Sequence, residues 1–90
     1  MNSTRYFQEQ VLRKRPYISL EMCERVVASP DWRDAQTDGR IRYWSFPREL
    51  EGRSLRVVTL EDGVTIHNAF PDRRFTIERL ERLKQLRGGR

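Results

Sequence analysis

Cysteine and histidine are almost absent from this sequence, which has one residue of each, Cys23 and His67. A single cysteine cannot close an internal disulfide, and the two residues together fall short of the four ligands of a structural zinc site. We therefore expect no disulfide, no metal site and no bound cofactor.

Long apolar runs are absent too. No stretch approaches the roughly 18 apolar residues that a membrane-spanning helix needs. The first residues, Met1 to Arg5, lack the hydrophobic segment of a signal peptide. We expect a soluble, cytoplasmic protein with no membrane partner.

Length and composition leave room for one hydrophobic core. The chain has 90 residues, of which 37% are apolar, and a domain of this size buries only a modest core. We expect a single domain at 1–90, with its core at about 5–75, a terminal helix at 76–87 and a disordered tail at 88–90.

Lysine is scarce, with two residues, whereas 16 of the 18 basic residues are arginine. Against 13 acidic residues they leave a net charge of +5. The planar guanidinium group forms paired hydrogen bonds with phosphates and carboxylates, so we expect an anionic partner. For any single arginine, a place on the solvated surface is the alternative interpretation.

Helical periodicity is present at both ends of the chain. Residues 4–14 carry apolar side chains at helical spacing before Pro16. A second helix is predicted between Ser19, which can cap it, and Ser29-Pro30, which ends it. A third, amphipathic helix follows Thr76, another good cap, and its apolar stripe consists of Ile77, Leu80, Leu83 and Leu86.

The middle of the chain is rich in β-forming residues. Segments 32–36 and 40–46 predict two strands, and segments 54–60 and 64–70 flank Asp62-Gly63, a strong hairpin signal. Segment 40–46 carries apolar groups on both faces, which favours a place inside the sheet. We predict an α+β fold, with N-terminal helices packed on one face of a three- to four-stranded antiparallel meander sheet, and a C-terminal amphipathic helix.

The register of the second hairpin decides which side chains share a face. A two-residue turn at Asp62-Gly63 predicts four residue pairs: Thr59 with Ile66, Val58 with His67, Val57 with Asn68 and Arg56 with Ala69. Arg56 and His67 then lie on the face turned away from the helices, whereas Asn68 and Phe70 point into the core. A turn one residue longer would separate Arg56 from His67.

The same hairpin carries a resemblance to a known family. The strand Leu55-Arg56-Val57-Val58-Thr59, the Asp62-Gly63 turn and the strand 64–70 leading into Asp72-Arg73 are similar to small bacterial toxins of the RelE/ParE superfamily, including its BrnT-like branch. Size, charge and element order agree over about residues 5–75. The resemblance implies an mRNA endonuclease, acting on the ribosome or on free RNA, that a cognate antitoxin holds inactive in a homodimeric or heteromeric complex.

The resemblance also implies a metal-independent mechanism, in which a base takes the proton of a ribose 2′-hydroxyl and cations stabilise the phosphorane. His67 is the candidate base or acid, and Arg56 and Arg73 are the candidate phosphate ligands. Asp72 would orient the histidine or an arginine. The resemblance also implies RNA-binding roles for Arg42, Tyr43, Trp44, Arg53 and Arg74. Of these, Tyr43 or Trp44 would stack on a base.

Other interpretations of the same residues stay open. The scaffold could be a binding module for nucleic acid or protein, without catalysis. The C-terminal stripe could dock a partner or pack on its own sheet. His67 could be structural, Asp72-Arg73 a surface turn, and Tyr43 and Trp44 core residues.

Overall fold

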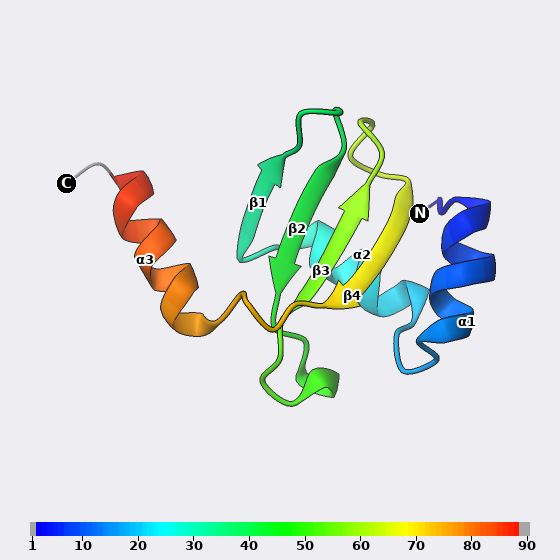
Figure 1. Cartoon of the computed structure of the whole chain (residues 1–90), viewed down its shortest axis with the longest axis horizontal. Coiled ribbons are helices and arrows are strands. Elements are labelled where there is room, and N and C mark those ends of the chain that lie inside the picture. The colour runs from blue at the N-terminus through cyan, green and yellow to red at the C-terminus, as the bar shows by residue number, and fades with distance from the viewer. Residues whose placement is uncertain (1, 89–90) are drawn as a thin grey trace.

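The structure is a computed structural model, and it describes residues 2–88 (Figure 1). Helical segments come first, a four-stranded antiparallel sheet follows, and one helix ends the chain. This confirms the predicted α+β fold. The elements, in chain order, are η1 (Phe7–Val11), α1 (Leu12–Lys14), α2 (Leu20–Ala28), β1 (Trp32–Ala35), β2 (Ile41–Ser45), η2 (Arg48–Leu50), β3 (Leu55–Thr59), β4 (Ile66–Pro71) and α3 (Ile77–Gly88).

The first two predicted helices form where their caps and apolar spacing place them. The first is a π-helical turn, η1, that continues into α1, and it buries Phe7 and Val11. The second, α2, begins after Ser19, whose hydroxyl accepts a hydrogen bond of 3.0 Å from the Met22 amide. Among the described residues, no helix has the length and apolar character to cross a membrane.

The sheet is a meander of strand order β1-β2-β3-β4, so β2 lies inside it as expected. Figure 1 shows α2 behind the sheet and α1 beside β4. The main core lies between these helices and the sheet, and contains Phe7, Val11, Ile18, Met22, Cys23, Val26, Ile41, Tyr43, Leu50, Leu55, Val57, Ile66 and Ala69. On the face of the sheet opposite α2, Leu80 and Leu83 of the C-terminal helix pack in a cluster with Trp32 and Trp44. We call this face the open face.

A β-bulge in the hairpin corrects the predicted register. Thr59 pairs with Ile66, as predicted, but one extra residue, His67, then follows in β4, so that Val58 pairs with Asn68 and Arg56 with Phe70. The predicted pairs Val58–His67, Val57–Asn68 and Arg56–Ala69 are therefore wrong, and Val57 pairs with Ala69. Ala69 is buried in the core, and Asn68 and Phe70 lie on the open face instead.

The start of the chain pairs with β4 directly before the bulge. The Ile66 amide donates to the Asn2 carbonyl at 2.9 Å, and the Thr4 amide donates to the Ile66 carbonyl at 2.9 Å. The segment around Ser3 thus forms a short parallel bridge to the outer edge of β4. This pairing fixes Ile66 with its side chain in the core, and the bulge restores the alternation of core and open-face residues after His67.

Helix α3 begins at its predicted cap, since the Thr76 hydroxyl accepts a hydrogen bond of 3.1 Å from the Arg79 amide. It lies beyond the β1 edge of the sheet, whereas α1 lies next to the β4 edge (Figure 1). Leu80 is buried and Leu83 partly buried in a second cluster with Trp44 and Phe75. The other half of the predicted stripe is exposed, because Ile77 is 50% and Leu86 is 72% accessible. Gly88, predicted to be in the disordered tail, ends α3, and residues 89–90 lie outside the described part.

Candidate functional site

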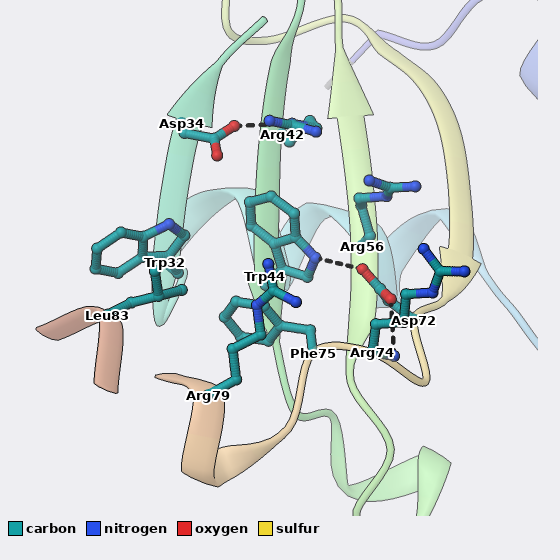
Figure 2. Close-up of a pocket in the computed structure, with 10 residues that line it drawn as sticks. All are labelled: Trp32, Asp34, Arg42, Trp44, Arg56, Asp72, Arg74, Phe75, Arg79 and Leu83. Carbon is teal, nitrogen blue, oxygen red and sulfur yellow. Dashed lines mark hydrogen bonds and ion pairs between the residues drawn. The ribbon is translucent and has the colours of Figure 1, made fainter. Parts of the chain in front are cut away.

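Aromatic side chains and arginines lie next to one another on the open face. The strand register places Trp32, Trp44, Arg56 and Phe70 in one row across all four strands. The next row holds Asp34, Arg42, Val58 and Asn68. Figure 2 shows the side chains of Trp32, Asp34, Arg42, Trp44 and Arg56 on this side of the sheet.

Arg56 stands at the centre of this face and forms no ion pair with another residue in 2–88. Its guanidinium carbon lies 4.3 Å from the ring centre of Phe70 and 6.0 Å from that of Trp44. Its Nε is buried, and no residue in 2–88 accepts a hydrogen bond from it. Burial lowers the pKa of Arg56 and repulsion from Arg42 adds to this, against the attraction of Asp72 and Asp34. The result is a partly desolvated cation that an incoming anion would stabilise.

Two hollows flank Arg56, and it lines both of them together with Arg42. The tryptophan hollow, of about 300 Å³, lies toward α3, and its lining consists of Trp32, Asp34, Arg42, Trp44, Arg56, Asp72, Arg74, Phe75, Arg79 and Leu83 (Figure 2). The histidine hollow, of about 290 Å³, lies toward the N-terminal helix, and its lining consists of Tyr6, Gln36, Arg40, Arg42, Arg56, Val58, His67, Asn68 and Phe70. The two arginines therefore form a ridge between two hollows.

His67 is held in the histidine hollow by the start of the chain. Its Nδ1 lies 2.9 Å from the Thr4 hydroxyl, and its ring stacks on Tyr6 with 5.0 Å between ring centres. Thr4 Oγ1 also accepts a hydrogen bond of 3.1 Å from the Phe7 amide. When Nδ1 donates to Thr4, the lone pair of Nε2 is left for a ligand.

The surroundings of His67 favour its neutral form. Burial lowers the pKa of the imidazole, and repulsion from Arg40 lowers it further. A histidine with a pKa below its usual range is uncharged at neutral pH and can take up a proton. His67 and Arg56 line the same hollow, although the strands that carry them contain a bulge that the hairpin signal did not predict.

Asp72 is engaged in the other hollow. Its Oδ2 accepts a hydrogen bond of 2.9 Å from Trp44 Nε1, and its Oδ1 accepts one of 3.1 Å from the Arg74 amide (Figure 2). Its carbonyl accepts a further bond of 2.7 Å from the Ser54 hydroxyl. These bonds fasten the segment between β4 and α3 to β2 and β3. Asp72 is not bonded to His67, but its charge favours the charged form of Arg56.

The remaining predicted residues divide between the open face and other places. Arg42 and Arg74 line the tryptophan hollow. Arg53 and Arg73 line a different surface, around Ser54 and Thr76, away from His67.

The two aromatic candidates on β2 point to opposite sides of the sheet. Tyr43 is buried in the main core, where its hydroxyl lies 3.2 Å from Thr59 Oγ1. Trp44 lies on the open face, but it is only 6% exposed, because Phe75 stacks on it with 5.0 Å between ring centres. Trp44 is therefore part of the floor of its hollow, and little of its ring is free for an RNA base.

Several residues that line the two hollows were not predicted from the sequence. Trp32, Phe70 and Arg79 line them, as do Tyr6 and Arg40. A signal was present for Tyr6, an aromatic residue next to the core residue Phe7 on a short amphipathic helix. For Phe70 the signal was hidden, because its face depends on the bulge.

Cys23 is buried, and burial keeps its thiol protonated. Burial raises the pKa of the Cys23 thiol to about 12, and repulsion from Glu24 adds to this, so the thiolate is not formed at neutral pH. Between residues 2 and 88, no group of three or more His, Cys, Asp or Glu side chains is placed to hold a metal ion.

Comparison of the chain with protein-family models, with curated proteins and with solved structures found no match. The functional interpretation therefore depends on the geometry of the open face. That geometry offers an anion the guanidinium groups of Arg40 and Arg56, which form no ion pair with another residue in 2–88, and it places the His67 imidazole at the same hollow.

Proposed function

We propose that this protein is a metal-independent endoribonuclease, the toxin of a type II toxin–antitoxin system, which cleaves mRNA in the histidine hollow. The observation that carries the proposal is that Arg56, a partly buried cation with no anionic partner among residues 2–88, and His67 line the same hollow. A phosphate on Arg56 brings the adjacent ribose to the side of the hollow where His67 lies.

In this mechanism His67 acts as the general base. Its Nε2 takes the proton of the ribose 2′-hydroxyl, whose oxygen attacks the adjacent phosphorus. The bond from phosphorus to the 5′-oxygen breaks, and that oxygen takes a proton from water, since the hollow opens to solvent. The products are a 2′,3′-cyclic phosphate and a free 5′-hydroxyl.

The arginines stabilise the charge that develops on the phosphorane. Arg56 is the main group, because its desolvated guanidinium gains a partner when the phosphate binds. Arg40 lines the same hollow and adds positive charge there. The lowered pKa of His67 supports its role, because a base must be unprotonated before the reaction.

The proposal includes a cellular setting. The enzyme acts in the cytoplasm on mRNA, either free or on the ribosome, and a cognate antitoxin inhibits it by covering the open face. The net charge of +5 suits both an RNA substrate and an acidic inhibitor.

A binding module without catalysis is the second candidate. It is favoured by the arginine–aromatic pairs of the open face, with Arg42 5.4 Å from the Trp44 ring centre and Arg56 4.3 Å from that of Phe70. Such pairs occur on surfaces that bind single-stranded RNA. What separates the two candidates is whether His67 performs chemistry.

The test is RNA cleavage by the purified protein and its His67→Ala and Arg56→Ala variants, with Arg13→Ala as a control that removes one exposed charge outside both hollows. We expect the first two variants to fold and to cleave at least a hundredfold more slowly, since general acid–base catalysis contributes about 10² to 10⁴ in rate. Undiminished cleavage by folded His67→Ala protein rejects the catalytic role. RNA binding without cleavage by the parent protein supports the binding module.

A further inference from the structure

The tryptophan hollow lies outside the reaction proposed above, yet its charge is not balanced. Its two carboxylates are engaged: Asp34 accepts a hydrogen bond of 2.8 Å from Arg42 Nε, and Asp72 accepts from the Trp44 indole and the Arg74 amide. Three further guanidinium groups line the same hollow, those of Arg56, Arg74 and Arg79. None of the three forms an ion pair with another residue in 2–88.

These three cations come from separate elements and meet around one cavity. Arg56 projects from β3, Arg74 from the segment after β4, and Arg79 from the first turns of α3 (Figure 2). The hydrogen bonds of Asp72 and the cap at Thr76 hold the two later segments in place. Because the fold gathers four guanidinium groups and only two carboxylates around this hollow, its lining carries a net positive charge that suits an anion.

The walls of the hollow indicate what kind of anion fits. Trp32 and Leu83 provide partly buried apolar surface beside the guanidinium groups. Its volume of about 300 Å³ lies at the lower end of the range for small-ligand sites, about 300 to 1,000 Å³. A nucleotide combines a phosphate with a ribose and a base that can lie against apolar walls.

The two hollows also share the ridge of Arg42 and Arg56. A strand that has a phosphate on Arg56 and one ribose beside His67 must continue past the ridge, and the tryptophan hollow is the cavity on its other side. A free anion would need only one hollow, whereas a polynucleotide explains why two cationic cavities adjoin.

We infer that the tryptophan hollow binds the nucleotide that flanks the cleaved bond, with Arg74 and Arg79 on its phosphate. The substrate is accordingly single-stranded RNA that crosses β3 and β2 from the N-terminal helix toward α3. This inference rests on the proposed function, and it adds a footprint longer than the scissile dinucleotide. It also assigns a substrate contact to α3 through Arg79.

The test is binding of a fluorescent RNA octamer with 2′-O-methyl groups, which cannot undergo 2′-hydroxyl attack, measured by anisotropy at several salt concentrations. Arg74→Ala and Arg79→Ala should each raise the Kd about tenfold and lower the salt dependence by about one counterion. Arg82→Ala removes the same charge from the same helix, outside the hollow, and should change the Kd less than twofold. Arg13→Ala serves as a further control. The side chains of Arg13, Arg74, Arg79 and Arg82 are exposed, so all four variants should fold.

Equal Kd values for Arg79→Ala, Arg74→Ala and Arg82→Ala overturn the inference. So does an octaglutamate peptide that binds as tightly as the RNA and loses affinity in the Arg79→Ala variant, because the hollow would then be a site for an acidic protein segment. These outcomes are independent of catalysis, since the methylated RNA is not cleaved. Failure of His67→Ala to reduce cleavage of ordinary RNA would reject the proposed function and leave the binding result standing.

Discussion

The guanidinium carbon of Arg56 lies 4.3 Å from the ring centre of Phe70, its cross-strand neighbour on β4. This neighbour is a consequence of the bulge at His67, because the regular register would have placed Ala69 there. His67 lies at the edge of the hollow that Arg56 lines, as does Phe70. One extra residue in β4 therefore supplies the aromatic partner of Arg56, while His67 stays on the same face of the sheet.

The contact between Arg56 and Phe70 can be tested by Phe70→Leu. Leucine keeps apolar bulk on the open face but removes the cation–π interaction, which contributes about 0.5–1 kcal/mol at a partly exposed site. We expect RNA binding to weaken about two- to fivefold while the fold is retained. The measurement is the Kd for a non-cleavable RNA, with circular dichroism as the check on folding. A Kd equal to that of the parent would contradict the positioning role of Phe70.

The bond between Trp44 and Asp72 predicts a loss of stability in Asp72→Ala. The variant leaves the buried indole N–H without its acceptor, at a cost of about 1–3 kcal/mol in the free energy of unfolding. Asp72→Asn keeps a carbonyl oxygen for the indole and should lose less. Urea denaturation of the three proteins measures the difference. Equal stability of Asp72→Ala and the parent would show that the bond does not fasten this segment.

The position of His67 predicts how cleavage depends on pH. Burial and Arg40 lower its pKa, so the base is unprotonated at neutral pH and the rate should rise with pH to a plateau, with its midpoint below about 6.5. Arg40→Ala should move this midpoint upward, because the repulsion is removed. The measurements are a pH–rate profile and an NMR titration of the single histidine. A midpoint above that of a free histidine would contradict the description of this site.

The same lowered pKa has a consequence for stability. The unfolded chain binds a proton at His67 more readily than the folded one, so the contribution of this residue to stability is fully present above the unfolded pKa of about 6.5. It is lost as the pH falls from there through the lower folded pKa. The sign would be reversed for a histidine paired with a carboxylate.

Two leucines of α3 should contribute unequally to the stability of the fold. Leu80 is buried against Trp44 and Phe75, whereas Leu86 is 72% exposed. Leu80→Ala should lower the free energy of unfolding by about 2–3 kcal/mol, and Leu86→Ala by less than about 0.5 kcal/mol. Thermal and urea denaturation measure both. Similar losses at the two positions would indicate that Leu86 is covered in solution, as in a dimer formed through α3.

The elements were predictable because their signals are local. Ser19 and Thr76 cap the helices that follow them, and Asp62-Gly63 lies in the turn between β3 and β4. The bulge was not predictable, since it depends on backbone pairing between Ile66 and residues some sixty positions earlier. A pattern of alternating side chains cannot report such a contact.

The candidate site was predictable only in part, for the same reason. Arg56 and His67 were identified from the hairpin, and the structure places them at one hollow. Asp72 and Arg73 follow the strand directly, yet hydrogen bonds to Trp44 and Ser54 turn this segment toward the other hollow. Local proximity in the chain therefore did not decide which residues share a cavity.

The most direct test of the central claim is the chemistry of the cleaved ends. A single-stranded RNA is incubated with the purified protein, and the fragments are analysed by mass spectrometry, beside the same RNA with 2′-O-methyl groups and the His67→Ala variant. We predict fragments with a 2′,3′-cyclic phosphate and a 5′-hydroxyl from the parent, and intact RNA in both controls. Cleavage of the methylated RNA, or fragments with a 5′-phosphate, would contradict attack by the 2′-hydroxyl in the histidine hollow.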